Sequence, residues 1–104
     1  MLQRFRGQHI VSIIASEIRT TTTREALILL EYCPGGHLLK RINDRNGVPY
    51  PMNDICKIFK QLLDAVAPFH RSVPPIIHRD LKLENILFGK VVIFGFAIVY
   101  YVLL

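Results

Sequence analysis

The sequence lacks the features that mark several classes of protein. It contains no tryptophan and only two cysteines, Cys33 and Cys56, among 104 residues. Two cysteines are too few for a disulfide framework, and their spacing matches no zinc-binding pattern. The first residues, MLQRFRGQ, lack the long apolar run of a secretory signal. These absences predict reduced thiols in a cytoplasmic protein of one domain at most.

Concentrated charge and long apolar runs are also missing. The net charge of +5 comes from scattered Lys and Arg, without a basic block or a stripe of interleaved aromatic residues. This pattern predicts a mildly basic surface and no nucleic-acid partner. The apolar stretch at the C-terminal end, residues 91–104, is shorter than the roughly 20 residues that cross a bilayer, so no membrane span is predicted.

Short runs of β-branched and aliphatic residues predict two strands, at residues 10–16 and 26–33. Between them, residues 17–25 include four consecutive threonines and predict a polar hairpin loop. A phosphorylation site is the alternative reading of the threonine run, and a solvated loop is preferred. Pro34, Gly35 and Gly36 end the second strand, and a short helix is expected from His37 to about Asp44.

The clearest helix is predicted over residues 54–70. Asn53 is the expected N-cap, and Pro68 is expected to end or kink the helix early. The apolar residues at helical spacing are Ile55, Ile58, Phe59, Leu62, Leu63, Val66 and Phe69. This periodicity predicts one face packed against a core.

The chemistry is concentrated in residues 78–85, which read HRDLKLEN. Phosphoryl transfer needs an acceptor for the substrate hydroxyl proton, positive charge on the transferred phosphate, and a held magnesium ion. Asp80 can accept the proton, Lys82 can reach the γ-phosphate, and Asn85 offers an amide oxygen to a metal. The spacing matches the kinase catalytic-loop motif H-R-D-L-x-x-x-N, so a charged surface loop formed by chance is the weaker reading.

With this motif the chain resembles eukaryotic Ser/Thr protein kinases. The segments PPIIHRDLKLENIL (74–87) and ALILLEYCPGGH (26–37) resemble the Numb-associated kinase family, which includes the adaptor-associated and cyclin-G-associated kinases. The resemblance implies an α+β fold: an N-lobe strand hairpin and hinge, then the first, mainly helical part of the C-lobe with the catalytic loop. It assigns residues 1–97 to a partial kinase domain, from the end of αC to the D-F-G position, and leaves residues 98–104 as an apolar tail.

The resemblance also implies a nucleotide site. Leu30 takes the gatekeeper position, the backbones of Glu31 and Cys33 face the adenine edge, and Leu87 forms the adenine floor, although Cys33 and Leu87 can equally be core residues. The implied cofactors are ATP and Mg²⁺, with Asn85 as a metal ligand. The implied partners are protein substrates with Ser or Thr, clathrin-adaptor proteins among them. The four positions of the regulatory spine are Leu2, Ile13, His78 and Phe94.

Three departures from the family pattern predict that this chain alone is inactive. The residues present begin after the glycine-rich loop, the β3 lysine and the αC glutamate of the family. Ile93 stands where the magnesium-binding aspartate of D-F-G belongs. Residues 98–104 are wholly apolar, which fits a mis-joined exon end best, then a short buried strand, and lastly a membrane anchor. Two hypotheses remain: a piece of a functional Ser/Thr kinase, or a degenerate kinase fragment that acts as a binding module.

Overall fold

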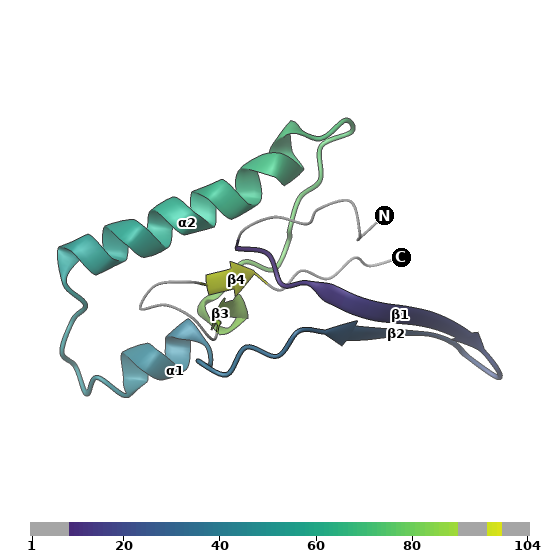
Figure 1. Cartoon of the computed structure of the whole chain (residues 1–104), viewed down its shortest axis with the longest axis horizontal. Helices are drawn as coiled ribbons and strands as arrows, with labels where there is room; N and C mark the ends of the chain where they lie inside the picture. Colours follow the sequence, from purple (N-terminus) through teal and green to yellow (C-terminus); the bar gives the residue numbers. More distant parts are fainter. Residues whose placement is uncertain (1–8, 90–95, 99–104) are drawn as a thin grey trace.

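The computed structural model describes residues 9–89 and 96–98 (Figure 1). Two helices and two short antiparallel sheets make up this part of the chain, with order β1-β2 in one sheet and β3-β4 in the other. The elements are β1 (Ile13–Thr20), β2 (Arg24–Leu30), α1 (Leu38–Asn43), α2 (Met52–Arg71), the 3₁₀ turn η2 (Leu83–Asn85), β3 (Ile86–Phe88) and β4 (Phe96–Ile98). The α+β class expected from the sequence is confirmed.

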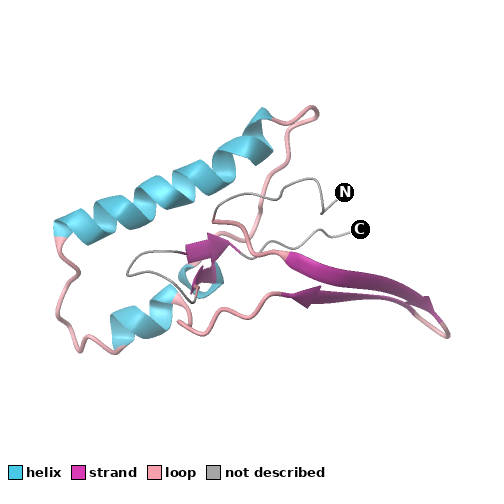
Figure 2. Cartoon of the chain, viewed as in Figure 1, coloured by secondary structure: helices cyan, strands magenta, loops and turns pink. Residues whose placement is uncertain are grey.

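The strands of the β1–β2 hairpin lie closer to its tip than the sequence pattern predicted, because residues 10–12 and 31–33 at its base are not in the strands. Residues 17–20 and 24–25, expected in a loop, lie in the strands, and only residues 21–23 form the turn (Figure 2). Arg19 lies opposite Glu25 across the hairpin, and Thr20 lies opposite Arg24. A cross-strand pair of opposite charge and a β-branched residue both favour strand pairing, so the polar segment extends the sheet.

The hairpin projects from the rest of the described chain and is exposed on both faces (Figure 1). Apolar side chains lie on its surface: Ile14, Ile18, Leu27, Ile28 and Leu29 are each more than 40% exposed. A hairpin without a covered face is marginal in water, because backbone pairing alone barely offsets the entropy of ordering the strands. The stability of the described fold therefore comes from elsewhere.

Helix α1 begins where the sequence predicted. The His37 side chain caps it, with Nδ1 accepting a hydrogen bond of 3.1 Å from the backbone N–H of Lys40. The chain leaves the helix at Asp44 and turns through Asn46 and Gly47, both with positive φ. An Asn–Gly pair adopts this left-handed backbone at little cost, so the turn follows from the sequence.

Helix α2 differs from its prediction at both ends. It begins at Met52 after Pro51, so Asn53 lies inside the first turn and the predicted N-cap is wrong. Pro68 neither ends nor interrupts the helix, which continues to Arg71. Proline loses only one backbone bond here, in the last turn, and the next residue, Phe69, is buried and anchors that turn to the core. No helix among the described residues is both long and apolar enough to cross a membrane.

One face of α2 contacts β4, and buried residues of α1, α2 and β3 form one core cluster. The buried members are Ile10, Leu38, Ile58, Ala65, Val66, Phe69, Ile86 and Phe88, with Tyr50, Leu62 and Ile76 packed against them. The predicted apolar stripe is wider than this contact, because Phe59 and Leu63 remain 59% and 66% exposed. Ala65, absent from the predicted stripe, is fully buried. A small residue there lets the helix approach the core closely.

Two phenylalanines on α2 test this packing. Phe69 is 4% exposed and Phe59 is 59% exposed. We expect Phe69→Ala to lower the free energy of unfolding by about 3 kcal/mol or more, because it leaves a cavity in the core. The matched control Phe59→Ala should change it by about 0.5 kcal/mol or less. Urea unfolding followed by circular dichroism measures both, and equal losses would show that the core is misassigned.

Candidate functional site

The polar loop at residues 78–85 lies between the segment that follows α2 and strand β3. His78 is buried, and its Nδ1 accepts a hydrogen bond of 3.1 Å from the backbone N–H of Asp80. Between them Arg79 has φ of 68°, a left-handed conformation that a non-glycine residue rarely adopts. Such backbone persists only where surrounding contacts impose it, and it is frequent at functional sites. The turn therefore fixes the position of the Asp80 backbone, from which the carboxylate side chain extends.

The structure brings together the three residues that the sequence assigned to catalysis. Asn85 donates from Nδ2 to the Asp80 carbonyl at 2.8 Å and to the Asp80 carboxylate Oδ2 at 3.0 Å. Lys82 Nζ lies 3.5 Å from the other carboxylate oxygen, Oδ1. Asp80 is thus held on one oxygen by a neutral amide and on the other by a cation. Both amide hydrogens of Asn85 point at Asp80. The side-chain oxygen of Asn85, Oδ1, is therefore the atom that can bind a ligand.

These three side chains differ in how much of their surface is exposed, which indicates different roles. Asn85 is 7% exposed, whereas the side chains of Lys82 and Asp80 are 52% and 43% exposed. An ion pair this exposed contributes little stability because water screens it. Lys82 can therefore leave Asp80 for a more highly charged phosphate at small cost. The cluster combines a fixed structural amide with an accessible carboxylate and cation.

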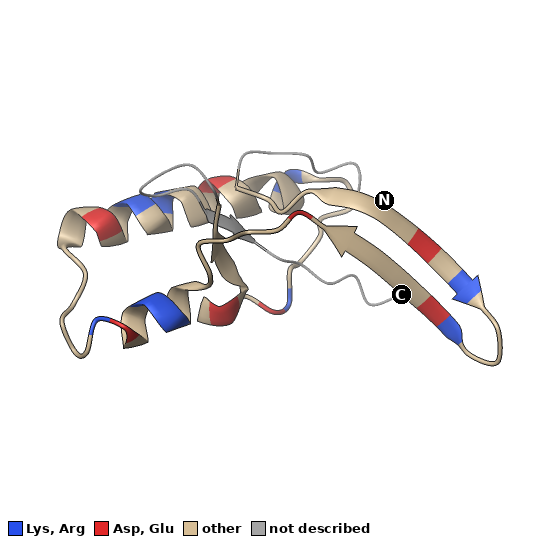
Figure 3. Cartoon of the chain, turned by 60° about the horizontal axis from the view of Figure 1, so that its bottom comes forward, with Lys and Arg blue, Asp and Glu red and all other residues tan. Residues whose placement is uncertain are grey.

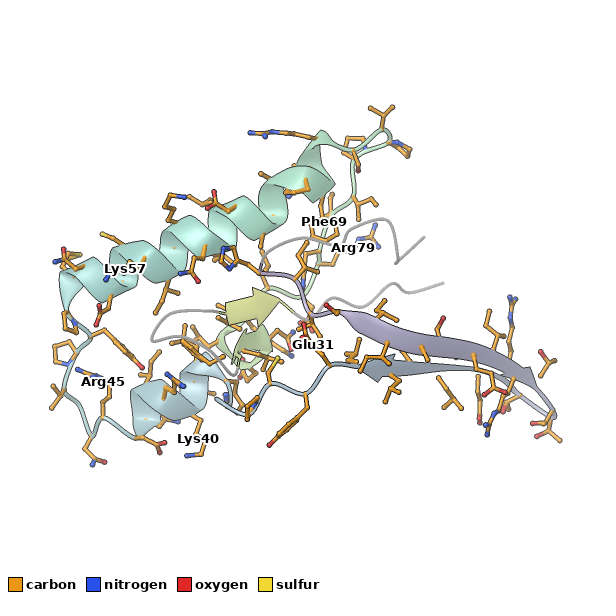
Figure 4. The ribbon with its side chains drawn as sticks, in the orientation of Figure 1. Glu31, Lys40, Arg45, Lys57, Phe69 and Arg79 are labelled. Atoms are coloured by element: carbon orange, nitrogen blue, oxygen red, sulfur yellow. The ribbon has the colours of Figure 1, made fainter. Side chains whose placement is uncertain are left out.

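The hinge residues are held at the base of the hairpin, where Figure 4 labels Glu31. The Glu31 N–H donates to the Ser12 carbonyl at 3.0 Å, and its side-chain Oε1 accepts from the Ser12 N–H at 2.7 Å. Among the described residues, neither the Glu31 carbonyl nor the Cys33 N–H has a hydrogen-bond partner. A free acceptor and a free donor two residues apart suit the edge of a purine base.

Backbone hydrogen bonds clamp the end of the hinge to strand β3. The Gly35 N–H donates to the Phe88 carbonyl and the Phe88 N–H donates to the Gly36 carbonyl, both at 2.9 Å. His37 forms a further bridge with Leu87. These bonds place Leu87, the predicted adenine floor, next to the hinge although more than fifty residues separate them in the sequence.

Arg41 completes this clamp and was missed by the sequence reasoning. Its guanidinium lies 3.8 Å from the centroid of the Phe88 ring, and its Nε donates to the Gly35 carbonyl at 3.0 Å. A Cβ on Gly35 would lie 2.5 Å from the Phe88 Cβ, so only glycine fits here. The Pro-Gly-Gly sequence signals a turn, but nothing in it signals a cation that stacks on a ring.

Other expected positions are only partly described. Of the regulatory spine, Ile13 is half-buried in β1 and His78 is buried in the loop, while Leu2 and Phe94 lie outside the described residues. Ile93 and most of the predicted tail, residues 99–104, lie outside them as well. Leu30, the expected gatekeeper, is half-buried opposite Ile13.

The residues that the structure describes do not by themselves complete a magnesium site. In the part of the chain that the structure describes, no three His, Cys, Asp or Glu residues lie together as metal ligands do. Asn85 Oδ1 and the Asp80 carboxylate are the oxygen donors of the Asp80–Lys82–Asn85 cluster, and Ile93 carries only hydrocarbon. Magnesium requires near-octahedral oxygen coordination, which these groups do not supply.

Comparison with known families decides the identity of the fold. A family model of the protein kinase domain matches residues 1–101. The chain belongs to the protein kinase domain family. This family is the one that the sequence predicted from the loop at residues 78–85 and from the strand and hinge at residues 26–37.

Individual relatives agree with this assignment. The chain is 46% identical over 79 residues to the protein kinase domain-containing protein ppk38 of Schizosaccharomyces pombe, covering 74% of this chain. It is 39% identical over 90 residues to the serine/threonine-protein kinase ppk30 of the same yeast, covering 83% of this chain. A probable serine/threonine-protein kinase of Dictyostelium discoideum is 44% identical over 68 residues, or 64% of this chain. The matched segments span 12%, 9% and 6% of those three proteins.

The hinge cysteine has a perturbed thiol. Burial raises the pKa of Cys33, and the negative charge of Glu31 raises it further. A raised pKa leaves less thiolate at neutral pH, so nucleophilic reactivity appears only at higher pH than for an ordinary cysteine. Cys56, on α2, is exposed and serves as an internal reference.

We expect Cys33 to react with iodoacetamide at pH 7.5 about tenfold more slowly than Cys56, for reasons of both burial and thiolate fraction. Peptide mass spectrometry over a time course measures both rates. Glu31→Gln removes the charge but keeps the side-chain oxygen that accepts from Ser12, so it should accelerate Cys33 and leave Cys56 unchanged. A slower or unchanged Cys33 in this variant would contradict the electrostatic cause.

Proposed function

We propose that this chain is the hinge and catalytic-loop part of a Ser/Thr protein kinase domain, which transfers the γ-phosphoryl group of ATP to hydroxyls of protein Ser and Thr. The observation that carries the proposal is the Asp80–Lys82–Asn85 cluster. Asn85 bonds at 2.8 and 3.0 Å to two oxygens of Asp80, which orients the carboxylate without neutralising it. A fixed, charged and accessible carboxylate is what a proton acceptor for a substrate hydroxyl requires.

Each residue of the cluster has a separate task in this proposal. Asp80 Oδ1 accepts the hydroxyl proton of the substrate as the oxygen of that hydroxyl attacks phosphorus. Lys82, now 3.5 Å from that oxygen, turns to the transferred phosphoryl group and stabilises its charge. Asn85 holds the carboxylate in place and has one amide oxygen free for a metal ion that other groups would have to complete.

The nucleotide would lie between the hinge and Leu87. The free carbonyl of Glu31 and the free N–H of Cys33 would read the adenine edge, and Leu87, held next to the hinge by the His37 bridge, would contact the ring. On the resemblance of residues 26–37 and 74–87, we further propose the Numb-associated branch of the kinases. That branch suggests clathrin-adaptor proteins as substrates and a cytoplasmic location.

A chimaera tests the catalytic assignment. Residues 74–87 of this chain replace the matched segment of the S. pombe kinase ppk30, and the product is assayed for transfer of ³²P from ATP to a Ser/Thr protein substrate. We expect the chimaera to be active, and Asp80→Ala within it to lower kcat by about a hundredfold or more. Glu84→Ala is the matched control, since this loop residue is exposed and, among the described residues, its carboxylate forms no hydrogen bond or ion pair with the cluster.

Two results would reject the assignment. An inactive chimaera that folds like its parent would show that this loop is not competent. An active one that is indifferent to Asp80→Ala would show that Asp80 is not the proton acceptor.

Ile93 favours a second function for the 104-residue polypeptide by itself, that of a non-catalytic kinase fragment. An isoleucine at the D-F-G position gives magnesium no oxygen, and the 104 residues contain no glycine-rich loop to cover the phosphates. In this form the fragment would act, if at all, by binding.

The purified 104-residue chain should therefore show no Mg-ATP-dependent phosphorylation of a generic Ser/Thr substrate above a buffer blank. Ile93→Asp alone should not restore activity, because groups that contact the phosphates are still missing. Activity that disappears in Asp80→Ala would contradict this prediction. Such a result would establish that the catalytic loop works without its usual partners.

A further inference from the structure

We propose that Thr22, at the tip of the β1–β2 hairpin, is a phosphorylation site for an arginine-directed Ser/Thr kinase, an enzyme whose substrate groove is acidic. In this role the chain is a substrate, so the proposal is independent of its own proposed activity. Three observations carry it: the accessibility of the tip, the placement of arginine, and the small number of contacts that hold the hairpin.

The hydroxyl of Thr22 is accessible. Residues 14–29 are all exposed, and residues 21–23 form the turn between the two strands (Figure 2). Within the described part of the chain, the Thr23 hydroxyl donates to Glu25 at 3.3 Å, whereas no side chain bonds to the hydroxyl of Thr22. A modifying enzyme meets neither a covering side chain nor a hydrogen bond to break at this hydroxyl.

The placement of arginine singles out Thr22 from the other hydroxyl residues. The sequence contains seven Ser and Thr residues, and Thr22 alone has an arginine, Arg19, three positions before it. The others are Ser12, Ser16, Thr20, Thr21, Thr23 and Ser72. A guanidinium forms paired hydrogen bonds with a carboxylate, so an acidic groove selects an arginine at a fixed distance from the acceptor hydroxyl.

The charges on the hairpin agree with this choice. Figure 3 shows a basic residue nearest the tip on each strand and an acidic residue next to it. Arg19 pairs with Glu17 on its own strand at 3.1 Å, but their side chains are 56% and 59% exposed. Such a pair is weak, and Arg19 can exchange Glu17 for the carboxylate of an enzyme at little cost. Arg24 lies two residues after Thr22, so a kinase that requires an acidic residue at that position after the acceptor would not recognise this site.

The hairpin can also present Thr22 in the extended form that a substrate groove accepts. Arg19 and Thr20 already lie in strand β1, which pairs on one side only, with β2, among the described residues. Beyond Thr20 and Arg24, one backbone bond closes the turn among the described residues, from the Thr21 N–H to the Thr23 carbonyl at 3.3 Å. Because neither face of the hairpin is buried, opening its tip exposes no core.

The reaction itself is an ordinary phosphoryl transfer. The Thr22 oxygen forms a bond to the γ-phosphorus of ATP, the bond from that phosphorus to the bridging oxygen breaks, and ADP leaves with the electron pair. The hydroxyl proton passes to the carboxylate base of the added kinase. The product carries about two negative charges between Arg19 and Arg24.

The test uses the full 104-residue chain, the catalytic subunit of an arginine-directed Ser/Thr kinase, and Mg-ATP, with fragmentation mass spectrometry to locate the phosphate. A peptide substrate of that kinase in the same reaction confirms that the enzyme is active, and a reaction without the kinase measures self-phosphorylation. We expect one phosphate, on Thr22. Thr22→Val should abolish it, and Thr21→Val should leave it in place.

Arginine variants test the recognition. Arg19→Ala should lower kcat/KM for Thr22 by about tenfold or more, the effect of losing a charged hydrogen-bonded pair. Arg24→Ala is the matched control from the other strand and should have a twofold effect at most, as a screened surface charge does. Three results would overturn the proposal: no phosphate on the chain while the peptide is phosphorylated, phosphate spread evenly over residues 20–23, or dependence on Glu25 rather than on Arg19.

Discussion

The contact on which the rest of this structure depends is the clamp between the hinge and strand β3. Gly35 and Gly36 exchange two backbone hydrogen bonds with Phe88, and Arg41 lies on the Phe88 ring while bonding to the Gly35 carbonyl. Phe88 is 2% exposed and belongs to the core beneath α2. The clamp therefore ties the hinge directly to the best-packed part of the chain. It also requires glycine at position 35, because a side chain there would collide with Phe88.

The geometry of the catalytic loop follows from the same contact. Asn85 ends η2, and Ile86 begins β3, whose position is set by the core and the hinge. Asn85 is buried, and strand β3, which follows it, holds it in place. The Nδ2 of Asn85 then fixes Asp80, five residues earlier, by two hydrogen bonds. At the other end, His78 is buried and accepts from the Asp80 N–H. Asp80 is thus positioned from both ends of an otherwise exposed loop, which is how a flexible segment can hold a precise carboxylate.

The sequence predicted the parts of this arrangement that depend on local chemistry. The spacing of His78, Asp80 and Asn85 predicted the site, and helical periodicity predicted α2. Prediction from the sequence failed where tertiary contacts determine the structure. The segment at residues 17–25 looked like a loop because its residues are polar, yet cross-strand pairing extends the strands through it. Periodicity gave the apolar stripe of α2 but not which part of it the core covers. Arg41 was missed because a cation stacked on a buried ring depends on a residue 47 positions away.

The ordered geometry of the Asp80–Lys82–Asn85 cluster is only weak evidence for catalytic activity. Among the residues that the structure describes, the bonds to Asp80 come from His78 and Asn85, and Asn85 is itself held by the core. Asn85 takes part in both tasks, since its Nδ2 orients the carboxylate while its Oδ1 is the predicted metal ligand. Isoleucine at the predicted D-F-G position removes an oxygen ligand for magnesium but none of these bonds to Asp80. The geometry at Asp80 therefore reports on His78 and Asn85, whereas magnesium binding also depends on the side chain at the predicted D-F-G position, so an ordered Asp80 is by itself no measure of activity.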